Sequence, residues 1–141
     1  MATQNKTDID QLLADSLKQL ASKKLLEKIT IKEITDLAGV IRPTFYNHFQ
    51  DKFELLEWII KKELLEPVQP LIRNDMFTEA MLLLFTNIER DKAFYSHVVK
   101  LEGPVTFHSI ASKCVREVLL TIINEPVSYT HLRAHETLAN L

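Results

Sequence analysis

Polar side chains that suit nucleic-acid recognition are crowded into residues 42–48, which read RPTFYNH. A guanidinium pairs with a phosphate or with the acceptor edge of guanine, and hydroxyl, amide and imidazole groups form hydrogen bonds to phosphates and base edges. The residues that carry these groups are Arg42, Thr44, Tyr46, Asn47 and His48. So many polar groups within one short segment predict a surface that contacts DNA.

These side chains need a rigid element to present them, and the flanking sequence predicts a helix-turn-helix. Thr30 and Glu33 have the spacing of a capping box, in which the two side chains satisfy backbone N–H groups at the start of a helix. Apolar residues then recur on one helical face, and Gly39 ends the helix because glycine adopts positive φ without steric cost. Pro43 suits the first turn of a second helix with an aromatic inner face. Short helix, glycine turn and short helix together make the motif.

The stretch GVIRPTFYNHFQDKFELLEWI resembles the core motif of the TetR family of bacterial transcriptional repressors. The run TFYNHFQDK, with ITIKEI upstream, is a specific match, and the resemblance covers about residues 8–60. The shorter run FYNHFQDKFELLEWI is also similar to short TetR proteins related to dihydroxyacetone-kinase regulators. One departure is Ile41, because family members normally place Ser or Ala before the second helix.

Residue chemistry and the resemblance together select ten candidate DNA-binding residues. Arg42 is expected to bind a guanine edge, with Pro43 or Thr44 touching a thymine methyl group. Tyr46 and Lys52 are expected, with His48, to bind phosphates. The full set is Thr30, Lys32, Ile41, Arg42, Pro43, Thr44, Tyr46, Asn47, His48 and Lys52.

The rest of the chain predicts further amphipathic helices, so the expected fold is all-α. An apolar stripe from Asp8 predicts a first helix that packs on the motif. Asp51 and Glu54 predict the start of a connecting helix, which Pro67 and Pro70 are expected to end. The predicted organisation is a three-helix DNA-binding head (1–50), a connecting helix (51–66), a partial helical regulatory lobe (74–125) and a tail (126–141).

Aromatic and polar residues beyond the head are candidates for an effector pocket, although such residues also commonly form a helical core. The candidates are Trp58, Phe85, Phe94, Tyr95, His97 and Phe107, with His108 and Cys114 beside them. Cys114 falls on an apolar stripe and is expected to be an inert buried thiol. Dimerisation and release of DNA by a small-molecule or protein effector are implications of the family resemblance.

The last residues, PVSYTHLRAHETLANL, resemble a translated adapter or cloning sequence, and a short native helix from Thr130 is the alternative. His131 and His135 are four residues apart, as ligands on one helix face would be, but no third ligand accompanies them. We therefore expect no metal site and a non-native tail.

Composition limits the remaining choices. The chain has 141 residues, 46% of them hydrophobic, and two glycines, which favours one helical domain of average size. Its single cysteine excludes an internal disulfide and suits a cytoplasmic location. The net charge is −2, with +1 over residues 1–50 and −3 over the remainder.

These features predict a DNA-binding regulator of a double-stranded operator, and the TetR resemblance implies that it is a homodimeric repressor. No Gly-rich phosphate loop or catalytic arrangement is evident, so we expect neither enzymatic activity nor a cofactor, and we expect no association with a membrane. A helical protein-interaction module that uses residues 42–48 against a partner protein is the alternative.

Overall fold

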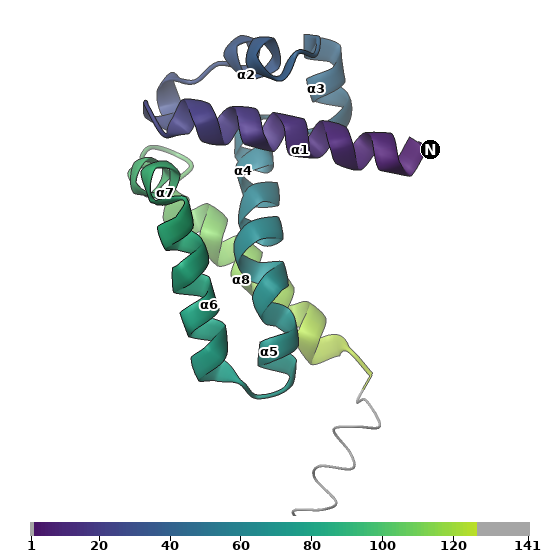
Figure 1. The fold of residues 1–141 in the computed structure, drawn as a ribbon, viewed down its shortest axis with the longest axis vertical. Helices are drawn as coiled ribbons and strands as arrows, with labels where there is room; N and C mark the ends of the chain where they lie inside the picture. The colour runs from purple at the N-terminus through teal and green to yellow at the C-terminus, as the bar shows by residue number, and fades with distance from the viewer. Residues whose placement is uncertain (1, 127–141) are drawn as a thin grey trace, which may run out of the picture.

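The computed structural model describes residues 2–126, and this part of the chain contains helices and no strands (Figure 1). The predicted all-α fold is confirmed. The elements in chain order are α1 (Ala2–Ala21), the 3-10 turn η1 (Leu26–Lys28), α2 (Ile31–Ala38), α3 (Arg42–His48), α4 (Lys52–Ile60), the π-helical turn η2 (Lys61–Leu65), the 3-10 turn η3 (Glu66–Val68), α5 (Gln69–Arg73), α6 (Phe77–Arg90), α7 (Lys92–Val98) and α8 (Phe107–Asn124). The expected tail begins at Pro126, and residues 127–141 lie outside the described part.

Helices α1, α2 and α3 form the head, with α1 lying across the other two (Figure 1). The buried stripe of α1 consists of Leu13, Ala14, Leu17 and Ala21, all fully enclosed. These positions recur at helical spacing, so one face of α1 is removed from water over the C-terminal half of the helix. The amphipathic first helix expected from Asp8 is therefore present, although its described start is at Ala2.

The local signals for the helix-turn-helix also appear as predicted. Thr30 and Glu33 form a complete capping box at the start of α2. Gly39 ends α2 in the left-handed region at φ 76°, and the space around it is open, so its backbone angle and not crowding accounts for glycine. Helix α3 begins after Ile41, which supplies no side-chain cap.

The connector does not end at Pro67 and Pro70, and that prediction was wrong. The helical path of α4 continues through η2 and η3 and ends with α5 at Arg73. A proline interrupts an α-helix because it lacks an N–H and its ring meets the carbonyl four residues earlier. Here the path changes its hydrogen-bonding pattern at each proline, so that Pro67 falls in the first turn of η3 and Pro70 in the first turn of α5.

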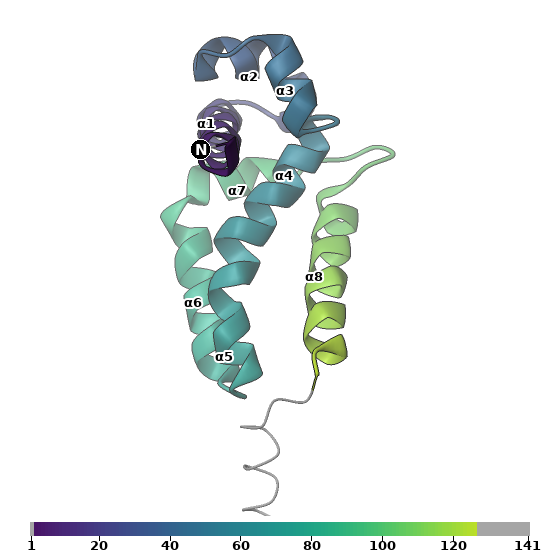
Figure 2. The ribbon, with the colours of Figure 1, turned by 90° about the vertical axis from the view of Figure 1, so that its right-hand side faces the viewer.

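Helices α6 and α8 flank the connector on different sides, and α7 lies beneath the C-terminal end of α1 (Figures 1 and 2). Phe94, Val98 and Leu101 belong to the same continuous hydrophobic core as the buried stripe of α1. Head and lobe therefore share one interior. None of the helices in residues 2–126 is both long enough and apolar enough to span a bilayer.

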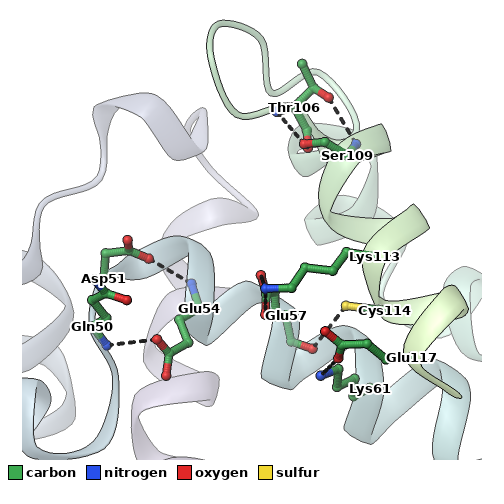
Figure 3. A network of polar contacts seen from close by, with 10 residues as sticks. All are labelled: Gln50, Asp51, Glu54, Glu57, Lys61, Thr106, Ser109, Lys113, Cys114 and Glu117. Atoms are coloured by element: carbon green, nitrogen blue, oxygen red, sulfur yellow. Dashed lines mark hydrogen bonds and ion pairs between the residues drawn. The ribbon is translucent and has the colours of Figure 1, made fainter. Parts of the chain in front are cut away.

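A polar network fastens α8 to α4 and η2 (Figure 3). Lys113 Nζ donates to both carboxylate oxygens of Glu57, at 3.0 and 3.3 Å, and Lys61 pairs with Glu117. Cys114 lies between these pairs, fully buried, with its Sγ 3.9 Å from the Glu57 carbonyl oxygen. Burial raises the pKa of the Cys114 thiol to about 11. Its placement agrees with the expected buried thiol.

Candidate nucleic-acid interface

Helix α3 presents one polar face to solvent and one aromatic face to the core. Arg42, Tyr46 and Asn47 are exposed, with 51% of Tyr46 accessible, and the Arg42 guanidinium makes a long hydrogen bond of 3.5 Å to the Tyr46 hydroxyl. On the opposite face Phe45 is fully buried and lies edge-on to Tyr46. The exposed donors are therefore carried on a helix whose position the core fixes.

The start of this face is apolar. Ile41 is 68% exposed and Pro43 is also exposed, while Thr44 is partly buried. Thr30 and Lys32 lie at the beginning of α2, both exposed, and Lys32 forms an ion pair with Asp36 at 2.6 Å. The predicted residues on α2 and α3 thus occupy one end of the molecule, where α2 and α3 lie beyond α1 (Figure 1).

His48 contributes to this site by anchoring α3, a role that differs from the phosphate contact predicted from the sequence. Its Nδ1 lies 2.8 Å from a carboxylate oxygen of Asp10 on α1, and both side chains are largely buried. Ser16, also on α1, donates a hydrogen bond of 2.6 Å to the Ile34 carbonyl of α2. Asp10 and Ser16 are polar residues on the buried face of α1. Polar residues within an otherwise apolar stripe were the feature of the sequence that could have indicated these contacts.

Lys52 does not extend towards solvent as a phosphate contact would. Its ammonium donates to the carbonyl oxygens of Leu26 at 2.7 Å and Ile29 at 2.8 Å, with the Glu27 carbonyl at 3.3 Å. Burial lowers the pKa of Lys52, against the smaller opposing effect of nearby Glu27 and Glu33. The three donors are thus directed at the backbone of η1, and this geometry favours a structural role over the expected contact with DNA.

The six candidate effector residues do not gather in one place. Phe94 and Tyr95 are buried in the core, with their ring centroids 4.9 Å apart, whereas Phe85 on α6 is 59% exposed. His97 bonds to a carbonyl within α7 and Phe107 starts α8. Of the six, Trp58 alone lines the open cleft of about 570 Å³ between the head, α4 and the start of α8.

Trp58 is partly buried, with its ring 6.4 Å from that of Phe49 at the end of α3. The cleft also receives Asp10 and His48 from the head and Glu57 from α4. It therefore adjoins the two side chains that anchor α3. An effector bound here would lie beside the joint between the head and the connector.

Two comparisons with known proteins agree with this geometry. Residues 15–59 match the family described as bacterial regulatory proteins, tetR family, a range that takes in α2, α3, most of α4 and the C-terminal third of α1. The HTH-type dhaKLM operon transcriptional activator DhaS of Lactococcus lactis subsp. lactis (strain IL1403) is 26% identical over 92 residues. That alignment covers 65% of this chain and 49% of the relative, so the chain spans about half the length of the curated relative it matches.

A three-helix head with a solvent-facing α3 is the arrangement of helix-turn-helix DNA-binding domains, and the sequence of residues 15–59 matches such a domain. Residues 15–59, about a third of the chain, match the DNA-binding domain of the TetR family. The resemblance inferred from residues 8–60 is confirmed.

Proposed function

We propose that this protein binds a specific double-stranded operator as a homodimer, and that a small-molecule or protein effector changes the affinity. The observation that carries the proposal is the exposed polar face of α3, held on α1 by the Asp10–His48 contact. The proposed interface comprises nine of the ten residues named from the sequence, and the tenth, Lys52, supports the backbone behind them. The proposed division remains a head over residues 1–50, a connector from 51 and a regulatory lobe over 74–125.

The protein could act on transcription as a repressor or as an activator. The TetR resemblance favours a repressor, whereas the name of the lactococcal relative describes an activator. Both activities need the same first step, which is recognition of an operator by the head. We therefore propose operator binding as the shared function, with repression as the outcome expected from the family resemblance.

Support for a homodimer comes from α8. An exposed apolar patch on this helix, here called the α8 patch, consists of Val115, Leu119, Leu120 and Ile123. Such a contiguous patch on the surface of a small protein commonly marks an interaction site. Two heads joined through a second copy would match two half-sites about 34–36 Å apart on one face of DNA.

The test is selection of duplexes from a random pool, followed by titration of the selected duplex and a scrambled one at several salt concentrations. Arg42→Ala is expected to lower affinity for the selected duplex by about 5- to 150-fold, the equivalent of roughly 1–3 kcal/mol for one lost bidentate contact. Affinity for the scrambled duplex should fall much less. Lys62→Ala, far from α3 on η2, is the matched control.

Two results would count against the proposal. Equal losses on both duplexes would make Arg42 a phosphate contact without a role in sequence recognition. Absence of any salt-dependent binding to DNA would favour the alternative, a protein-interaction module that uses the same face of α3, because neutralising phosphates makes binding depend on salt.

A further inference from the structure

The backbone carbonyl of Glu63 on the connector lacks its usual hydrogen-bond donor because of Pro67. Pro67 has no N–H, so the carbonyl of Glu63, four residues earlier, has no α-helical donor from that position. The structure supplies a donor from another helix, because Asn87 Nδ2 on α6 bonds to the Glu63 carbonyl oxygen at 3.2 Å. The π-helical turn η2 is therefore attached to α6 through the backbone of Glu63.

The side chain of Glu63 makes further contacts with two other elements. One carboxylate oxygen accepts from Lys18 Nζ of α1 at 2.8 Å, and the other lies 3.4 Å from the Tyr95 hydroxyl of α7. Lys18 Nζ also donates to Asp91 at the α6–α7 corner, at 2.7 Å. We call Lys18, Glu63 and Asp91 the triad. It links the head helix α1, the connector and the regulatory lobe.

The electrostatics make the triad depend on its single cation. The side chains of Glu63 and Asp91 are 21% and 33% exposed, so water only partly screens the two carboxylates from each other. Burial on its own would lower the pKa of Lys18, but the hydrogen bonds to Asp91 and Glu63 raise it overall. The ammonium stays charged, and without it two negative groups would face each other across the joint.

The position of Lys18 gives the triad a mechanical link to α3. Asp10 and Lys18 are eight residues apart on one helix, which is about 12 Å along its axis. Asp10 contacts His48 of α3, and Lys18 contacts Glu63 of the connector. A tilt of α1 by about 5° around the triad would move the Asp10 end by about 1 Å over that length. Helix α1 thus joins the triad to the DNA-contacting helix.

We propose that Lys18 and Glu63 are positioning residues for DNA binding, because the triad sets the angle at which the head is held on the connector. This inference rests on the proposed function, in which two heads engage half-sites at a fixed spacing. A change in head angle alters that spacing and weakens paired binding, while each head keeps its own contacts with DNA.

The experiment compares Lys18→Met and Glu63→Gln with the wild-type protein. Glu63→Gln keeps the size of the side chain and leaves the Asn87 contact with the backbone intact. Lys62→Met is the matched control, since Lys62 lies on the same turn and forms an exposed pair with Glu66 at 3.5 Å. Lys18→Arg tests rescue, because a guanidinium also donates to two carboxylates.

The probes are a duplex selected by the wild-type protein from a random pool, the same duplex with one base pair inserted at its centre, and a scrambled duplex. Lys18→Met and Glu63→Gln should lose at least tenfold in affinity for the selected duplex. They should stay within twofold of wild type on the scrambled duplex, and they should discriminate less against the insertion. The Lys62→Met and Lys18→Arg variants should resemble wild type.

Unchanged ratios of selected to scrambled binding in both variants would overturn the inference. So would equal losses on the two duplexes, which would show general damage to the fold. If the wild-type protein selects no duplex, the proposed function fails, and hydrogen exchange then decides on the triad. Faster exchange in α1 and α7 of Lys18→Met, but not of Lys62→Met, would show that the triad holds the head on the connector, and unchanged exchange would refute that attachment.

Discussion

Replacing Lys52 with methionine separates a structural role from a role in binding DNA. The substitution keeps most of the aliphatic stem and removes the ammonium that donates to the carbonyls of Leu26 and Ile29. Hydrogen bonds from charged groups contribute about 1.5–3 kcal/mol, and a buried acceptor left without a donor costs about 1–3 kcal/mol. Because Lys52 is only partly buried, we expect a total loss of about 2 kcal/mol for the group of contacts.

The assay is a thermal melt followed by circular dichroism, together with the salt dependence of binding to a scrambled duplex. A loss of about 2 kcal/mol should lower the melting temperature by roughly 5–10 °C in a protein of this size. The salt slope should not change, whereas removal of a true phosphate contact would reduce it by about 0.9. Lys32→Met, which removes an exposed cation of α2, is the control and should leave the melting temperature within about 1 °C.

An unchanged melting temperature with a reduced salt slope would refute this reasoning. It would mean that Lys52 leaves the carbonyls of η1 when DNA binds and contacts a phosphate, as predicted from the sequence. A change in both quantities would mean that the residue supports the head in the free protein and binds DNA in the complex.

Three further predictions concern the lobe and the connector. Burial raises the pKa of Cys114 to about 11. Its thiolate fraction at pH 8 should therefore be about 100-fold below that of an ordinary thiol. A thiol reagent should label the protein rapidly only after unfolding. An effector that releases DNA should change the fluorescence of Trp58, which lines the cleft beside the α3 anchor; a true inducer that leaves the emission unchanged would show that the signal bypasses this position. Leu120→Glu in the α8 patch should shift sedimentation towards the monomer without lowering helicity, and a dimer of unchanged stability would place the homodimer interface elsewhere.

The sequence was informative where structure depends on near neighbours. The capping box at Thr30 and the positive φ of Gly39 each involve residues within a few positions, so α2 and the turn after it could be predicted. The stripe of α1 predicted its buried face for the same reason. The family motif then added the solvent-facing role of α3, since the inner aromatic residues leave the remaining side chains outside.

Contacts between distant residues were beyond these signals. The helical path continues past Pro67, and the carbonyl that the proline leaves without a donor is satisfied by Asn87, twenty positions later in the chain. Lys52 was predicted to contact a phosphate. Its actual acceptors are backbone carbonyls of η1 and the residue after it, and no local sequence pattern indicates that this segment lies against the start of α4. The candidate effector residues do not lie together in the structure. Aromatic residues on an amphipathic helix suit a core as well as a pocket, so the sequence alone could not distinguish the two.

The shared interior of head and lobe has a consequence for how the protein folds and how its parts can be exchanged. Helix α7 packs against α1, and Phe94, Val98 and Leu101 complete the same core as Leu13 and Leu17. A head excised at the end of α4 would expose apolar surface that α7 normally covers, so cooperative unfolding should involve head and lobe as one unit. A chimaera that moves this head onto another regulator must therefore also carry α7, or a helix that replaces it beneath α1.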